Sequence, residues 1–182
     1  MDIVEAVVNL DGAPELHLAR ILLLLNAFAG DEGDGSIEGL TKLAKLDFLL
    51  RYPVMLDRAL QAKGRSAKEV RLEDYERQSV ESEMVRYRFG PWDHRYREFL
   101  NILVAKNLAA VSIEGRKVVI TLTDKGRGIA TNLMERPAFE SYARRSLLLK
   151  RNFDMTATNL MRFIYQTFPE IVTLRSNQVI PT

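Results

Sequence analysis

A helix that is apolar on nearly every side is the feature that most constrains the fold of this chain. Pro14 suits the first turn of a helix, and Leu or Ile fills seven of the positions from 16 to 25 in "PELHLARILLLLNAFA". A helix on the surface of a domain would show a single apolar stripe. We therefore expect residues 14–29 to form a central core helix or one side of an oligomer interface.

The composition is typical of a folded protein from a reducing compartment. A chain of 182 residues with 47% apolar content can bury a sizeable core. It has no cysteine, which excludes disulfides and thiolate chemistry and fits a cytosolic protein. The apolar run after Arg20 is too short to span a membrane, and the N-terminus lacks the pattern of a signal peptide. We expect a cytoplasmic protein.

Charge is distributed unevenly along the chain. The net charge is +2, but residues 1–50 hold nine acidic and three basic side chains, which leaves +8 for the remaining residues. The acidic part could contact a basic partner surface and the basic part could face phosphate. Ordinary solvated faces would give the same pattern, so charge alone does not decide between a binding role and a structural one.

Local signals predict mostly helices with one β-hairpin. Ser36 is a suitable N-cap for a helix to residue 51, and Pro53 opens another to residue 62. The charged segment 63–83 is expected to be an exposed linker or insertion, in part helical. A strand at 84–89 then leads into a helix at 93–107. The rest of the chain is predicted to form a hairpin around Glu114-Gly115 and helices from 124 and at 138–151. A last helix is predicted from about Asp154 or Thr156 to Phe168, followed by an extended tail.

This order of elements is typical of a winged helix-turn-helix with an insertion at 52–91. The segment "VVITLTDKGRGIA" resembles the end of a wing, because Leu122 can close the strand onto the core, Thr123 can cap the next helix and Gly126 allows close packing. We therefore predict a mainly α chain with a small β-hairpin, a winged-helix core and additional C-terminal helices. The expected division is a winged-helix domain at 1–136, with an insertion at about 63–83, and a helical extension at 137–182.

The sequence gives little support to an enzyme, a metal site or a cofactor site. The only histidines are His17, inside the apolar helix, and His94, and neither has acidic neighbours at metal-ligand spacing. The segment "DKGRGIAT" lacks the spacing of a phosphate-binding loop, and "GDEGDGS" lacks the closing glutamate of a calcium loop. We predict no catalytic, metal or cofactor residues, and an unrecognised hydrolase is left only as a third alternative.

The predicted helix at 93–107 is the one that would enter DNA in a winged-helix protein. Helical phase places one set of its residues on the core side, namely Trp92, Tyr96, Phe99, Leu100, Leu103 and Asn107. The opposite side shows Glu98 and Ile102 in mid-face, where a helix in the major groove would carry cationic or amide side chains. Glu98 and Ile102 are therefore predicted to contact a protein.

Cationic side chains near this helix could contact the DNA backbone without reading bases. The predicted DNA-binding residues are Arg86, Arg88, Arg95, Arg97, Arg116 and Lys117. Pairing of the strand arginines with the acidic linker is an equally good interpretation.

Asp47 stands out because it lies within the apolar arc of its predicted helix. Arg51 is one turn later, and this spacing allows a salt bridge between the two. We interpret them as a structural pair near the helix end. The functional alternative is that Asp47 and Arg51 are polar anchors in a protein interface.

Two segments carry a resemblance to a known family. "GLTKLAKLDFLLRYP" at 39–53 and "YRFGPWDHRYREFLNILVAKNLAAV" at 87–111 resemble the middle component of bacterial ABC three-component defence systems of the Lamassu type. The resemblance covers about residues 14–130. It implies a winged-helix protein that binds an SMC-like ATPase and acts with an effector subunit, a nuclease, to couple detection of foreign DNA to effector activation.

The resemblance leaves an alternative from another class. The Gly-Pro-aromatic motif also occurs in other winged-helix-like proteins, including SocA-like antitoxins, so the chain could be a dimeric DNA-binding transcriptional regulator or antitoxin. A homodimer and direct contact with DNA stay open in both interpretations.

Overall fold

The computed structural model describes residues 14–77, 84–85, 95–170 and 179–180. Within this part of the chain the fold is mainly α, with a three-stranded sheet and a separate two-stranded pair. The prediction of a mainly α chain with a small β-hairpin is confirmed. In chain order the elements are α2 (Pro14–Ala29), β1 (Ile37–Glu38), α3 (Leu40–Arg51), α4 (Pro53–Ala62), η1 (Lys68–Val70), β2 (Met84–Val85), α6 (Tyr96–Ala105), β3 (Ala109–Glu114), β4 (Lys117–Leu122), α7 (Asp124–Met134), η2 (Pro137–Phe139), α8 (Glu140–Phe153), α9 (Ala157–Thr167) and β5 (Val179–Ile180).

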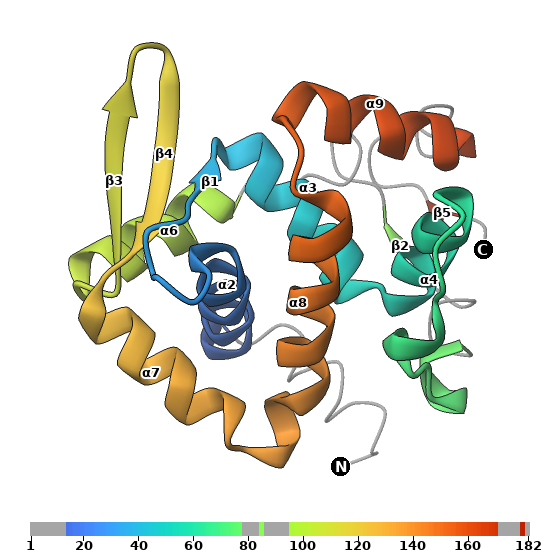
Figure 1. Ribbon diagram of the computed structural model, residues 1–182, viewed down its shortest axis with the longest axis horizontal. Coiled ribbons are helices and arrows are strands. Elements are labelled where there is room, and N and C mark those ends of the chain that lie inside the picture. The colour runs from blue at the N-terminus through green and yellow to red at the C-terminus, as the bar shows by residue number, and fades with distance from the viewer. Residues whose placement is uncertain (1–13, 78–83, 86–94, 171–178, 181–182) are drawn as a thin grey trace.

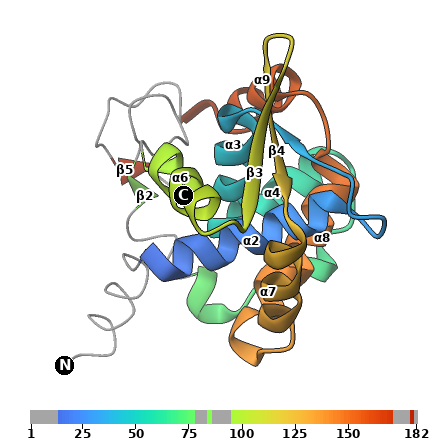
Figure 2. The ribbon, with the colours of Figure 1, turned by 90° about the vertical axis from the view of Figure 1, so that its left-hand side faces the viewer.

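Helix α2 lies at the centre of the molecule. It contacts α3, α6, α7, α8 and β4, which enclose it in both views (Figures 1 and 2). Ile21, Leu24 and Phe28 are fully buried in the main apolar cluster. Of the two roles left open by the sequence, the structure gives α2 that of a central core helix.

The three-stranded sheet has the order β1-β4-β3 and is antiparallel throughout. Its short strand β1 corrects the prediction of a helix from Ser36. The backbone of Gly39 has a φ of 91°, which few residues other than glycine adopt, and α3 begins only after it, at Leu40. Ile37 instead pairs with Ile120 and is fully buried, so the segment before Gly39 contributes to the sheet.

Strands β3 and β4 form the predicted hairpin. Glu114 pairs with Lys117 across a two-residue loop in which Gly115 has a φ of 64°. The hairpin extends well beyond the helices around it (Figure 1).

The predicted start of the helix after the hairpin is also confirmed. The Thr123 hydroxyl accepts a hydrogen bond from the backbone N–H of Gly126 at 3.0 Å and so caps α7. A Cβ at Gly126 would overlap with the carbonyl oxygen of Leu108, which explains why this position is glycine.

Helix α6 lies beside β3 (Figure 2), and most of the described residues of its predicted core side are buried. Tyr96, Phe99, Leu100 and Leu103 are all buried. The expectation for Asn107 was wrong: it is exposed, and its φ of 57° turns the chain after the end of α6. Asparagine tolerates this left-handed conformation better than most residues.

The segment after α4 and the C-terminal helices join the same apolar cluster as α2. Leu149 on α8, Ile164 on α9 and Val70 are fully buried members of it. The guanidinium of Arg145, also buried, donates to the backbone oxygens of Val70 and Arg71 at 2.9 and 3.2 Å. Arg145 therefore holds the described part of segment 63–83 against α8, while most residues of that part are exposed, as expected for an exposed linker or insertion. The division into a domain at 1–136 and an extension at 137–182 stays a prediction.

The predicted strand at 84–89 and the predicted extended tail meet in space. β2 pairs with β5 in antiparallel register, with Met84 opposite Ile180. Residues 86–94, including the Gly90-Pro91 break, lie outside the described part of the chain.

Candidate functional site

The outer side of α6 and the projecting half of the hairpin form the surface at which the predicted partner contacts gather. We call it the α6–hairpin surface. On α6, Glu98 is exposed, Ile102 is half-buried, and Val104, on another side of the helix, is 41% exposed. On β3, Val111 is 42% and Ile113 is 76% exposed. The surface therefore combines aliphatic side chains with single charges.

The predicted DNA-binding residues differ in their environments. Arg97 and Arg116 are exposed. Lys117 is also exposed, but its Nζ donates to the Glu38 carboxylate at 3.0 Å. Arg95 is half-buried with its guanidinium 5.5 Å from the centre of the Phe99 ring. Arg86 and Arg88 lie outside the described residues, so the structure places only part of the predicted cluster.

A buried polar cluster anchors α6 to the core beneath this surface. The guanidinium of Arg20 on α2 donates to both carboxylate oxygens of Asp47 on α3, at 2.5 and 2.8 Å. The hydroxyl of Tyr96, the first residue of α6, donates to the same carboxylate. Arg20 and Asp47 are 1% and 0% exposed, so this bidentate pair is almost fully removed from water.

His17 completes the buried cluster. Its Nδ1 accepts a hydrogen bond from Arg20 at 2.8 Å, and its ring stacks on Phe99 with 5.0 Å between the ring centres. Burial and the adjacent Arg20 charge lower the pKa of His17 to about 4. The imidazole is therefore neutral at physiological pH, as its role as an acceptor requires.

The charges of the cluster are fixed by their mutual contacts. Burial alone would raise the pKa of Asp47, but the Arg20 charge and the hydrogen bonds from Arg20 and Tyr96 hold it below its ordinary value. Burial and the Asp47 charge raise the pKa of Tyr96 well above its ordinary value, which keeps the hydroxyl a donor. The cluster is a structural link between three helices, with each ionised group matched by a partner.

The cluster corrects the prediction for Asp47 and Arg51. The sequence spacing suggested Arg51 as the partner of Asp47, whereas the structure brings Arg20 to it from a different helix. Arg51 contributes its charge to the low pKa of Asp47 and lies with its guanidinium 5.5 Å from the centre of the Tyr52 ring. Because Asp47 is fully buried, it does not face a partner surface in this structure.

Sequence reasoning missed Arg20 as a member of the site, although a signal was present. His17 and Arg20 are three positions apart in a helix that is otherwise apolar on nearly every side. A charged side chain in such a helix must find a buried partner, because an unpaired charge is costly away from water. Asp47, which also lies in an apolar arc of its helix, was the candidate for the buried counter-ion of Arg20.

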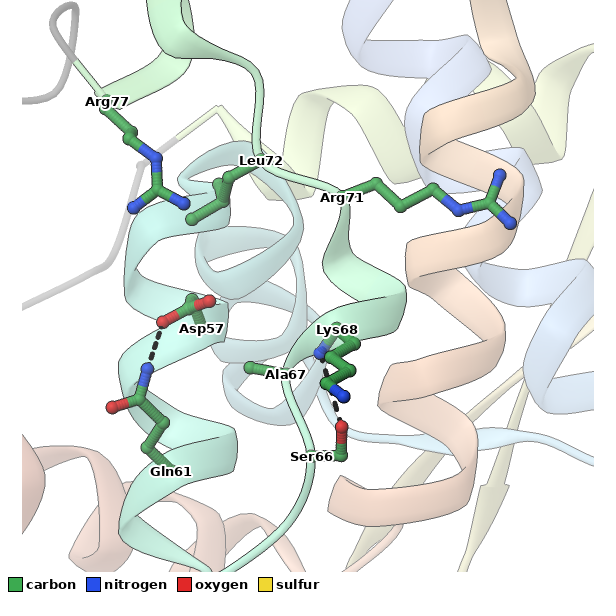
Figure 3. A pocket seen from close by; sticks show the side chains of 8 residues that line it. All are labelled: Asp57, Gln61, Ser66, Ala67, Lys68, Arg71, Leu72 and Arg77. Atoms are coloured by element: carbon green, nitrogen blue, oxygen red, sulfur yellow. Dashed lines mark hydrogen bonds between the residues drawn. The ribbon is translucent and has the colours of Figure 1, made fainter.

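A shallow pocket of about 420 Å³ lies between α4 and the segment that follows it. Its polar lining is mixed: Asp57 bonds to Gln61 on one wall, while Arg77 lies beside Leu72 at the other end (Figure 3). Arg71 directs its guanidinium away from this space (Figure 3). These side chains do not converge on a common point, so the pocket lacks the arrangement of a catalytic or anion site.

The described part of the chain offers neither a metal centre nor a membrane helix. Among those residues there is no group of three or more His, Asp or Glu side chains placed to hold a metal ion. Within the same ranges, no helix combines the length and apolar character needed to cross a membrane.

Comparison with known proteins identifies the family. The family model described as "ABC-three component (ABC-3C) system Middle Component 4" matches residues 36–150, which include α3, α6, the hairpin and most of α8. No curated protein and no solved structure matches the chain. A middle component belongs to a system of several components, so protein partners are implied. The chain belongs to the Middle Component 4 family of ABC-three component systems.

Proposed function

We propose that this chain is a non-catalytic accessory subunit of an antiphage complex of the Lamassu type. In this role it binds an SMC-like ATPase and helps to couple detection of foreign DNA to activation of an effector nuclease, in the cytoplasm. The observation that carries the proposal is the family match over residues 36–150, a range that contains the whole α6–hairpin surface.

A winged-helix interpretation of the core supports this role. The order α2, β1, α3, α6, β3, β4 with the sheet order β1-β4-β3 is the arrangement of helices and strands that such a core has, and α4 to β2 form the insertion. The helix beside the wing is then α6. Winged helices bind DNA, proteins or both, so the kind of partner has to be inferred from the chemistry of the α6–hairpin surface.

The chemistry of that surface favours a protein partner for α6. Glu98 and Ile102 lie one turn apart on the outer side of the helix, where closely spaced phosphates would repel the carboxylate and gain nothing from the aliphatic group. Protein interfaces combine an apolar core with a polar rim, and Ile102 and Glu98 fit these two parts respectively. The ATPase is accordingly proposed to contact α6.

Co-purification with the ATPase component tests the proposal. Co-expression of the chain with the SMC-like ATPase of its own system should give a complex that stays together at micromolar concentration. Glu98→Lys should weaken that complex, whereas Glu135→Lys, which makes the same charge change at an exposed residue after α7, should leave it intact. Failure of the unmodified pair to associate would sink the proposal.

A dimeric DNA-binding regulator or antitoxin remains the second function, because Arg97 and Arg116 are exposed cations near the hairpin. Under this alternative, Arg116→Glu with Lys117→Glu should weaken DNA binding and flatten its dependence on salt. Equal DNA binding by this variant and the unmodified chain would remove the wing tip from any DNA interface.

A further inference from the structure

The outer strand of the three-stranded sheet has a free edge. β3 pairs with β4 on one side only, and the sheet order β1-β4-β3 places it at the end. Five of its six residues, from Ala110 to Glu114, are exposed. Natural proteins usually protect such edges with charges, proline or bulges, because an open edge pairs readily with another strand. Here the side chains along the open part include Val111 and Ile113.

Two hydrogen bonds establish which backbone groups are free on this edge. The N–H of Thr123 donates to the carbonyl oxygen of Leu108 at 3.1 Å, at the base of the hairpin. Backbone groups alternate in direction along an antiparallel strand, so the residues of β3 that bond to β4 are those an even number of positions from Leu108. On β4, Val118 lies opposite Ile113 and its oxygen accepts from Gly39 at 2.7 Å, so that oxygen faces β1 and not β3.

The N–H and C=O groups of Val111 and Ile113 therefore point away from β4. No hydrogen bond joins any of these four groups to another residue of the described chain. Both side chains are β-branched and exposed, at 42% and 76%, and they share one face of the strand. This combination, a row of unpaired donors and acceptors beside aliphatic side chains, is what a strand from another chain needs in order to add to the sheet.

We propose that β3 binds an extended segment of a partner component, which adds to the sheet as a fourth strand. The inference rests on the proposed function, because it specifies how the ATPase is held. The pairing would continue the interface proposed for α6, since α6 and β3 lie side by side.

Area and charge favour a partner segment over a second copy of this chain. Pairing between two β3 strands alone would join only six residues from each chain, whereas a stable specific interface needs roughly 1,000 Å² of buried surface. A partner segment avoids this limit because it is part of a larger contact. The exposed cations Lys106, three residues before β3, and Arg116, two residues after it, have no carboxylate partner in the described chain. We therefore expect every second residue of the added strand to be aliphatic, and we expect acidic residues near its two ends.

Proline at a single position tests the pairing without breaking the hairpin. Val111→Pro removes an N–H that points away from β4, and edge strands tolerate proline at such positions. Val111→Thr is the matched control, because it keeps both the N–H and the β-branched shape. The probe is the co-expressed SMC-like ATPase. We expect Val111→Pro to weaken the complex by about tenfold or more and Val111→Thr to change it by no more than about twofold.

Hydrogen exchange of the unmodified chain gives an independent readout. The amides of Val111 and Ile113 should exchange rapidly in the isolated chain and be protected in the complex, and this holds as a test even if Val111→Pro fails to fold. A complex that forms but leaves these amides unprotected, or that Val111→Pro does not weaken, overturns the inference while the proposed function stands. Absence of any complex overturns both. Dimerisation of the isolated chain that Val111→Pro abolishes would assign the edge to a second copy instead.

Discussion

Replacement of Asp47 by Asn should destabilise the protein more than any surface change. The amide has the same shape as the carboxylate, but it leaves Arg20, which is 1% exposed, as a buried cation without its counter-ion. The NH2 group of the asparagine would also face one of the two guanidinium nitrogens that now donate to Asp47, so two donors would meet without an acceptor. Breaking a buried pair by removing one partner costs about 3–5 kcal/mol. For a chain of this length that loss corresponds to a fall in Tm of roughly 6–20 °C.

Thermal and urea unfolding, followed by circular dichroism, measure the effect. Glu38→Gln is the matched control, because it removes one charge from the exposed Lys117–Glu38 pair and should cost less than about 1 kcal/mol. The triple variant Arg20→Met, Asp47→Leu, Tyr96→Phe removes both charges and the hydroxyl that donates to Asp47, and should recover part of the stability lost in Asp47→Asn. If Asp47→Asn and Glu38→Gln had the same small effect, the reasoning about the buried cluster would be refuted.

Three further predictions concern the cluster and the helix after the hairpin. Tyr96→Phe removes one hydrogen bond to a buried carboxylate and should cost about 1.5–3 kcal/mol in urea unfolding, with native circular dichroism retained as the check on folding. Gly126→Ala should destabilise because its Cβ would overlap with the backbone of Leu108, whereas Gly128→Ala, with open space and a helical position, should stabilise by about 0.5–1 kcal/mol; equal effects would contradict this packing. The folded state keeps His17 neutral down to a pKa of about 4 while the unfolded chain protonates near 6.5, so stability should fall by about 3 kcal/mol as the pH drops through this window. Urea unfolding from pH 7.5 to 4 should show this slope, and His17→Gln should remove it; a slope unchanged in the variant would assign the effect to other groups.

The elements that could be predicted from the sequence depend on neighbours within a few residues. Pro53 at the start of α4 and the hydroxyl of Thr123 at the start of α7 specify helix ends locally. The two-residue loop with Gly115 specifies the hairpin in the same way. Helical phase also placed most of the inward residues of α6 correctly, because burial follows the 3.6-residue period.

The candidate site was only partly predictable, because its buried half depends on contacts between helices. The exposed side of α6 follows from helical phase, so the sequence alone assigns Glu98 and Ile102 to an outer face. The partner of Asp47 could not be assigned in this way, because Arg20 is 27 positions away and meets it only when α2 packs on α3. Sequence spacing compares residues within one helix and therefore favoured Arg51.

Local patterns in the chain specify the central helix, the helical character of most other segments, the hairpin and the outer face of α6. Each of these follows from periodicity, capping or turn chemistry. Packing in three dimensions was needed to bring Ile37 into the sheet, to join Asp47 to Arg20, and to leave β3 with an open edge beside Val111 and Ile113. Strand order and buried ion pairs join residues that are distant in the chain, and no local pattern specifies which distant groups will meet.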